Sequence, residues 1–337
     1  MRFNLRIIVS CCAVAAHSWG SACDTSSVAQ AIDRGNLSAA EAGLKALEAR
    51  GQPCDEILLQ YGRLRLAQSD LPAAEDLFLR FFNAAPGDAR ASYQIALVAM
   101  MKGDYRAADA FSTGALSYQP DYAEALVIQG RLLAMKGQTV EAMASLQRAC
   151  KLKPQDPEAY FELGAVYDRQ KRYLEAVEQF ERTVALNPAD ARAWDYLGLN
   201  LEPLGQVERA DAAFKKGLEV NRGRWSDNFL SYNYGRFLFK QNRLEESRKH
   251  MDRALELNQP VRAVHYEHAK LSLRMRDLVV ARREAEKALE LPDRAGVILD
   301  LQIYYLLQQI YRQAGEPALA HKYAELSRTT AIPSRER

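Results

Sequence analysis

The sequence predicts an all-α fold built from repeated antiparallel helix pairs, because three residue types recur at one interval of 34 residues. The prolines of this series are Pro86, Pro120, Pro154 and Pro188, and the alanines are Ala74, Ala108, Ala142, Ala176 and Ala210. Gly103, Gly137 and Gly205 share one phase of the same interval. A fixed period of this length indicates that each unit is one supersecondary element stacked on its neighbours.

The unit that begins at Pro157 explains why each repeat forms two helices. Gly164 falls in the middle of the first helix, where Gly is less favourable than Ala by about 1 kcal/mol, so we expect a neighbouring helix to approach closely there. Ala176 lets the hairpin close on the second helix. Pro188 ends that helix, because Pro has no amide hydrogen and disfavours helix at the preceding residue.

The same unit also resembles a known family. It reads Tyr160-x2-Leu163-Gly164-x2-Tyr167, then Ala176-x3-Phe180 and Pro188, and the next unit keeps Trp194, Leu197, Gly198, Ala210 and Phe214. This pattern resembles the tetratricopeptide repeat, a helix–turn–helix unit of 34 residues. The resemblance implies one continuous array of about nine such units in a right-handed superhelical solenoid.

The register divides the chain into four segments. We expect a signal peptide at 1–22, a degenerate N-terminal capping unit at 23–54, five regular repeats at 55–224, and three divergent repeats with short insertions at 225–337. A polar outermost repeat suits the end of a solenoid, whose outer face has no neighbour. Pro203 should kink or shorten the first helix of its unit.

The N-terminal segment has the order of a secretory leader. Arg2 and Arg6 precede an apolar run, and small residues end at Ala22. The run is half of the ~20 residues that span a bilayer, so we expect an exported, periplasmic or other extracytoplasmic protein. An alternative is a lipid anchor at Cys23, although Gly20 stands where a lipoprotein signal usually has Leu.

Cys23 and Cys54 are candidates for a disulfide. They lie at the start of the first helix and just past the second helix of the terminal unit, and an antiparallel hairpin brings those ends together. Such a bond forms in an oxidising compartment and typically stabilises by about 2 to 4 kcal/mol. Cys150 is expected to be a small core residue.

Composition and motifs argue against nucleic-acid binding, catalysis and metal binding. The 45 Lys and Arg against 43 Asp and Glu argue against a dedicated nucleic-acid binder. No phosphate-binding loop or nucleophile elbow occurs in the sequence, and we expect no catalytic residue and no cofactor. His265 and His268 are three residues apart, yet nothing is spaced to complete a metal site, so we expect packed, hydrogen-bonded histidines.

The inner face of the solenoid, lined by first helices, is the expected binding surface. One helical stripe along these helices carries aromatic and apolar residues early and Tyr with Arg or Lys late. Such residues make good anchors and steering charges. The predicted partner-binding residues are Tyr93, Leu97, Met101, Phe161, Tyr232, Arg236, Lys240, Tyr266, Lys270, Arg274 and Tyr305.

Charge is distributed unevenly along the array. Residues 23–221 carry 22 basic and 28 acidic residues, whereas 222–337 carry 21 basic and 15 acidic ones. The basic C-terminal part could orient an acidic partner. We therefore expect a non-catalytic scaffold that holds an extended segment or helix of another protein. The alternatives are an outer-membrane-tethered lipoprotein assembly factor and an accessory module of an envelope enzyme complex.

Overall fold

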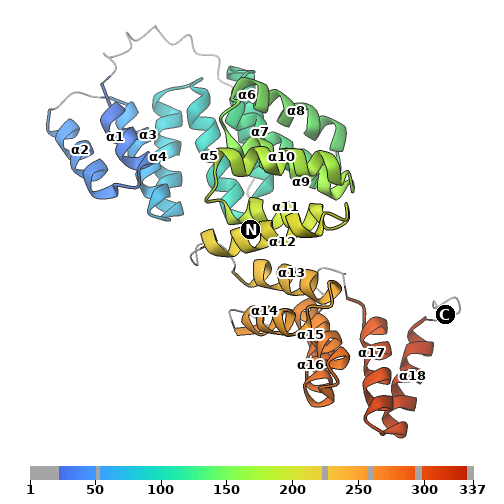
Figure 1. Ribbon diagram of the computed structural model, residues 1–337. Helices are drawn as coiled ribbons and strands as arrows, with labels where there is room; N and C mark the ends of the chain where they lie inside the picture. The colour runs from blue at the N-terminus through green and yellow to red at the C-terminus, as the bar shows by residue number, and fades with distance from the viewer. Residues whose placement is uncertain (1–22, 51–53, 222–226, 257–260, 293–297, 332–337) are drawn as a thin grey trace, which may run out of the picture. The chain divides into compact units, whose positions relative to one another are not determined.

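The computed structural model describes residues 23–50, 54–221, 227–256, 261–292 and 298–331. These residues form eighteen α-helices and no β-strand, and the helices follow one another as nine hairpins (Figure 1). The all-α prediction is confirmed. The expected leader at 1–22 lies outside the described residues, as do most of the residues of the short insertions expected within 225–337. None of the described helices is long and apolar enough to cross a bilayer.

The chain divides into two compact units, one reaching to Lys153 and the other starting at Pro154. The sequence predicts one continuous array across this point. In a solenoid each repeat contacts only its neighbours, so an array can divide between any two of its helix pairs.

The N-terminal unit contains four helix pairs, and each pair packs on the next. Their bounds are α1 Ser26–Asp33, α2 Leu37–Ala49, α3 Glu56–Ala67, α4 Leu71–Ala84, α5 Ala89–Lys102, α6 Tyr105–Tyr118, α7 Ala123–Met135 and α8 Thr139–Leu152.

The C-terminal unit contains five pairs that stack in the same way. Their bounds are α9 Pro157–Arg169, α10 Tyr173–Leu186, α11 Ala191–Leu201, α12 Val207–Asn221, α13 Asp227–Lys240, α14 Leu244–Glu256, α15 Arg262–Arg274, α16 Leu278–Glu290, α17 Asp300–Gln313 and α18 Pro317–Ala331.

The repeated Gly and Ala positions bring the two helices of a pair together. A Cβ atom added at Gly164 would lie 2.9 Å from the Phe180 ring, and one added at Gly198 would lie 2.8 Å from the Phe214 ring. Ala176 is fully buried on the facing helix. The expected close approach is confirmed, and the facing Phe of the second helix fills the space that the absent Cβ leaves.

The turn inside each hairpin has a further regularity. In the described part of the chain, every helix pair turns through one residue in the left-handed region, with φ between 58° and 76°. These residues are Gly35, Ser69, Gly103, Gly137, Lys171, Gly205, Asn242, Arg276 and Gly315. Glycine accepts this conformation without steric cost, whereas a residue with a side chain is strained in it.

Proline sets two helix ends as the sequence predicts. The helix α11 stops at Leu201, two residues before Pro203, and has 11 residues against 13 in α9 and 14 in α13. The helix α10 stops at Leu186, two residues before Pro188. Both prolines therefore act as stop signals.

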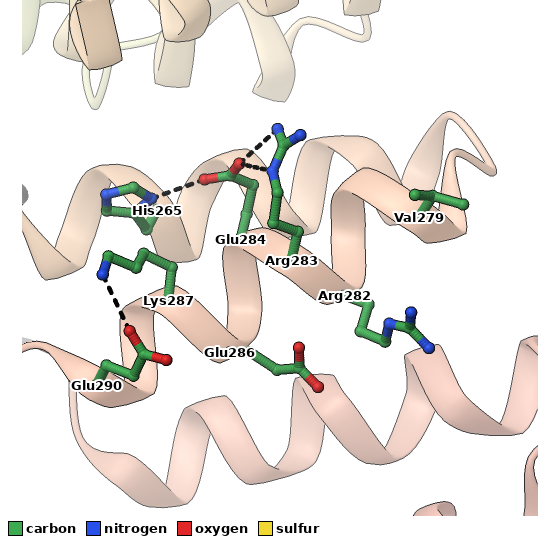
Figure 2. Close-up of a pocket in the computed structure, with 8 residues that line it drawn as sticks. All are labelled: His265, Val279, Arg282, Arg283, Glu284, Glu286, Lys287 and Glu290. Atoms are coloured by element: carbon green, nitrogen blue, oxygen red, sulfur yellow. Dashed lines mark hydrogen bonds and ion pairs between the residues drawn. The ribbon is translucent and has the colours of Figure 1, made fainter.

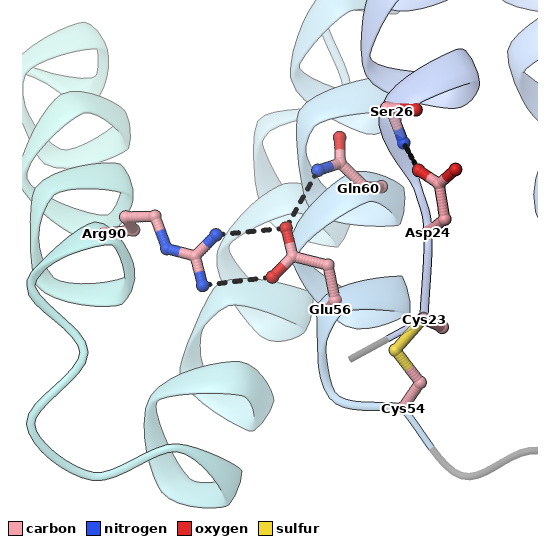
Figure 3. Close-up of a disulfide and its surroundings, with 7 residues drawn as sticks. All are labelled: Cys23, Asp24, Ser26, Cys54, Glu56, Gln60 and Arg90. Atoms are coloured by element: carbon pink, nitrogen blue, oxygen red, sulfur yellow. Dashed lines mark hydrogen bonds and ion pairs between the residues drawn. A yellow bond between two sulfur atoms is a disulfide. The ribbon is translucent and has the colours of Figure 1, made fainter. Parts of the chain in front are cut away.

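The N-terminal pair is tied to the following helix by the expected disulfide. Cys23 and Cys54 are bonded, with their Cα atoms 6.1 Å apart (Figure 3). Next to this bond, Glu56 at the start of α3 accepts hydrogen bonds from Gln60 and from Arg90 of α5. The disulfide anchors the outermost hairpin, which buries few side chains of its own, and the Glu56–Arg90 ion pair joins α3 to α5.

Candidate functional site

The predicted binding residues fall in both compact units. Tyr93, Leu97 and Met101 lie on α5 of the N-terminal unit. The Tyr93 ring is half-buried and packs on Tyr122, with 5.1 Å between the ring centroids. Met101 is 54 % exposed at the end of the helix. Leu97 is half-buried beside them, so these three residues form a mainly apolar stretch of surface.

Phe161 does not fit the prediction. Its side chain is only 7 % exposed on α9, and its ring lies against the rings of Phe180 and Tyr196. The guanidinium of Arg192 covers it at 4.5 Å from the ring centroid. Phe161 is a core residue, because helical spacing identifies the face of a helix but not how deeply the neighbouring helices bury it.

The predicted residues of α13 are held by contacts within the unit. The guanidinium carbon of Arg236 lies 5.9 Å from the centre of the half-buried Tyr232 ring. The ammonium group of Lys240 pairs with Glu202 at 2.7 Å. Their positive charges are thus partly engaged before any partner binds.

The next helices form an open groove, here called the α13–α15–α17 groove, with a volume of about 930 Å³. Its apolar floor consists of Phe239, Leu273, Leu278 and Leu306. Its polar rim consists of Lys270, Arg274, Arg276, Gln309 and Gln313. No carboxylate is among the described residues that line it, so the groove combines an apolar floor with a basic rim.

Charge pairing in this groove is incomplete. Lys270 contacts Glu267 at 2.8 Å, and its ammonium group also lies 5.4 Å from the centre of the Tyr266 ring and 5.8 Å from that of Phe239. Arg274 and Arg276 are exposed, and neither has an ion-pair partner among the residues that the structure describes. Two guanidinium groups are therefore available to a ligand.

Arg276 occupies the left-handed turn position between α15 and α16, with φ at 62°. Among the nine hairpins that the structure describes, three others also have a residue other than glycine at this position, but of these four residues only Arg276 lines the groove. Left-handed backbone costs about 1–2 kcal/mol for a residue with a Cβ. The chain thus keeps an arginine at a groove position where glycine would be more stable.

Sequence reasoning found part of this site. Lys270 and Arg274 were expected and line the groove, and Tyr266 supports Lys270. Tyr305 is 48 % exposed on α17, next to the groove residue Leu306. Phe239, Leu273 and Arg276 were missed. The 34-residue phase of the turn glycines would have placed Arg276 in a turn, but only the packed helices show which turn borders a groove.

A buried polar cluster lies between α11 and α13 of the same unit. Asp195 is 1 % exposed, and one of its oxygens accepts a hydrogen bond of 2.8 Å from the Asn233 amide. Its other oxygen has no hydrogen-bond partner among the described residues. Burial raises the pKa of Asp195 to about 7, although the hydrogen bond from Asn233 opposes this.

The described helices carry His, Cys, Asp and Glu, the residue types that ligate metal ions in proteins. Among the side chains that the structure describes, no three His, Cys, Asp or Glu residues lie where they could hold a metal ion.

Comparisons with known proteins agree with this architecture. Family models described as TPR repeat and tetratricopeptide repeat match residues 130–171, 157–190 and 230–260. A comparison with curated proteins gave no match.

Solved structures share the fold at low sequence identity. The protein of a study titled "Functional Characterization of Pseudomonas Aeruginosa pilF" is 18% identical, with a TM-score of 0.55, over 62% of this chain and 91% of that chain. A tetratricopeptide repeat protein from Parabacteroides merdae is 18% identical, with a TM-score of 0.54, over 76% and 98%.

The APC/C hetero-tetramer Cut9–Hcn1 gives a TM-score of 0.62 at 14% identity, over 87% of this chain and 56% of that chain. At these identities the likeness concerns the fold alone. Together with the three repeat matches and the stacked helix pairs, it leads to one conclusion: the chain is a tetratricopeptide repeat protein.

Proposed function

We propose that the chain is an exported, non-catalytic scaffold that holds an acidic segment of another protein in the α13–α15–α17 groove. The observation that carries this proposal is the combination of an open apolar floor with two exposed, unpaired guanidinium groups, Arg274 and Arg276. Repeat folds of this class serve in general as protein-interaction scaffolds, and function must be argued from the site.

The floor and the rim have different tasks. An apolar side chain of the partner that covers Phe239, Leu273 and Leu306 gains roughly 25 cal/mol for each Å² removed from water. Carboxylates of the partner pair with the guanidinium groups, which speeds association and fixes orientation more than it adds affinity. Gln309 and Gln313 offer amide groups that can hydrogen-bond to an extended segment or to the side chains of a helix.

Charge reversal tests the groove. The wild type, the double variant Arg274→Glu/Arg276→Glu and a control, Arg34→Glu/Arg106→Glu, are each used to capture partners from an envelope extract. Both control arginines are exposed, without an ion-pair partner among the described residues, and lie outside the groove. The captured protein is then purified, and its dissociation constant is measured with each form.

We expect the groove variant to bind at least tenfold more weakly, which is about 1.4 kcal/mol, while the control binds as the wild type does. Equal binding by all three forms would move the site elsewhere. If binding weakens equally in the groove variant and the control variant, the partner responds to net charge alone. That result would contradict the proposal that the groove is the binding site.

Export is supported by the disulfide, because such bonds persist in oxidising compartments. The lipid-anchor alternative needs the sulfur of Cys23, which is bonded to Cys54 in this structure. Mass spectrometry of the protein isolated from its native host separates the two. We expect a chain that begins at Cys23 with an intact disulfide, and an acylated Cys23 would favour the tethered assembly factor.

A further inference from the structure

Behind the groove, four alternating acidic and imidazole side chains connect three helices. They are Asp252 of α14, His268 and His265 of α15, and Glu284 of α16. The Nε2 atom of His268 lies 3.1 Å from Asp252 Oδ1, and its Nδ1 atom lies 4.0 Å from Glu284 Oε2. His265 Nδ1 lies 2.7 Å from the same Glu284 oxygen (Figure 2).

His268 is the most deeply buried member of this cluster. It is 2 % exposed, and neither ring nitrogen has an aligned hydrogen-bond partner among the described residues. His265 differs, because it has the hydrogen bond to Glu284 that the sequence prediction requires. The prediction of a packed, hydrogen-bonded histidine is thus met by His265 and only half met by His268.

Charged groups from both neighbouring helices face His268. Asp252 and Arg248 come from α14, and Glu284 and Arg283 come from α16. Arg283 holds the second oxygen of Glu284 at 2.7 Å, and Arg248 pairs with Asp277 at 3.1 Å. Burial lowers the pKa of His268, and the two arginines act in the same direction, against the two carboxylates. The ring is therefore neutral at pH 7.

The helix α15 links this cluster to the groove. Lys270, Leu273 and Arg274 follow His268 by two to six residues, which places them on the opposite side of a helix with 3.6 residues per turn. One side of α15 thus packs a titratable imidazole on α14 and α16, and the other side lines the groove. A displacement of α15 changes both sides together.

We propose that protonation of His268 loosens the packing of α15 on α14 and α16 and thereby weakens ligand binding in the α13–α15–α17 groove. A buried imidazolium lacks the hydration that it has in water, and the Asp252 oxygen 3.1 Å from Nε2 is not aligned to accept a hydrogen bond from it. The helix must therefore shift until Asp252 or solvent can form an aligned hydrogen bond with the protonated ring. The binding half of this inference rests on the proposed function, whereas the change in packing stands without it.

The direction of the pH effect follows from the linkage between proton binding and folding. Because the folded-state pKa of His268 lies below the ordinary value, the unfolded or locally open chain binds the proton better. Stability of the α14–α16 region is complete above about pH 6.5 and falls as the pH drops below it. The lowered pKa of Glu284 acts at lower pH, below the usual range of a glutamate, so the two groups are separable.

Hydrogen exchange of the full chain tests the packing change. Protection of the α15 amides is compared at pH 7.5 and pH 5.5, after correction for intrinsic exchange, with α10 as the internal reference. We expect protection of α15 to fall by up to about tenfold relative to α10 in the wild type. His268→Gln should remove that difference, and His265→Gln should retain it. An equal fall in His268→Gln would overturn the proposal.

NMR titration of His268 and peptide binding at the two pH values test the proposal independently of hydrogen exchange. The imidazole of His268 is titrated by NMR in the wild type, which needs no folded variant; an apparent pKa at or above that of free histidine would overturn the proposal. Binding of a fluorescent synthetic peptide of alternating Glu and Leu is measured at both pH values. A peptide that binds at neither pH contradicts the proposed function, while the exchange and NMR results still decide the switch.

Discussion

The two compact units differ in what they bury. In the N-terminal unit, the buried polar side chains among the described residues are uncharged: Thr25, Gln60, Ser92 and Ser112. In the C-terminal unit, the described residues include six buried side chains that carry or can carry charge: Glu162, Asp195, Arg262, Glu267, His268 and Glu284. Burying such groups is costly unless they are paired. Of these six, Asp195, Arg262 and His268 each have a buried polar atom without a hydrogen-bond partner among the described residues, so the cost falls on the second unit.

The two units also differ in the features that they contribute to stability and to recognition. The N-terminal unit has a disulfide-linked cap and an apolar surface on α5, whereas the groove and the titratable clusters belong to the C-terminal unit. Residues that cost stability are expected where function needs them. Substitutions in the first unit should therefore change stability without changing groove binding, whereas substitutions in the second unit should also change binding or the pH response.

The largest expected effect comes from removing the disulfide. Cys23→Ser/Cys54→Ser should destabilise the N-terminal unit by about 2 to 4 kcal/mol, because the reduced chain gains conformational freedom when it unfolds. Denaturant unfolding, monitored by hydrogen exchange of the α1 and α2 amides, measures this change in the free energy of unfolding. Binding in the α13–α15–α17 groove should not change. A loss of groove binding in this variant would contradict the separation of tasks between the units.

Asp195→Asn should act in the opposite direction. The raised pKa of Asp195 means that its stabilising contribution is complete at acid pH and is lost as the pH rises through about 7. An amide of nearly the same shape carries no charge, so the variant should be more stable than the wild type at pH 8 by about 1 to 3 kcal/mol. Unfolding free energies at pH 5 and pH 8 measure the effect. If the difference in unfolding free energy between the variant and the wild type were the same at both pH values, the prediction would be wrong.

These two predictions show what the sequence could and could not supply. The 34-residue period predicts the helix pairs, their ends at Pro188 and Pro203, and the close approach at Gly164, because these features depend on local chemistry and spacing. The disulfide follows from hairpin geometry. The pKa of Asp195 depends on the distant Asn233 and on complete burial. Helical periodicity indicates the face of a residue but not its depth, which is also why Phe161 was misplaced.

Single substitutions in the two units should differ in their effect on partner binding. Phe239→Ala removes the largest side chain of the apolar floor and should weaken partner binding about tenfold, since aromatic anchors dominate interface energies. Met101→Ala is the matched control, because it removes an exposed apolar side chain from the N-terminal unit. Calorimetry with the purified partner measures both. Equal losses would place binding across both units.

The smallest effect is expected at the strained turn. Arg276→Gly should stabilise the C-terminal unit by about 1 kcal/mol, because glycine relieves the left-handed backbone strain. The same substitution should weaken partner binding by a few fold, because one guanidinium group of the rim is lost. Asn242→Gly, in the preceding hairpin, is the control that should gain stability without losing affinity. A gain in stability with unchanged binding by Arg276→Gly would exclude the rim from recognition.

The central claim is that the α13–α15–α17 groove is where the partner binds. A photo-crosslinking amino acid placed at Leu273 on the groove floor, and separately at the exposed Leu174 on α10, tests it in intact cells. We expect one acidic protein segment to crosslink at position 273 and not at 174, and peptide mapping should show carboxylates next to the crosslinked residue. Crosslinking of the same partner at 174 but not at 273 would contradict the account.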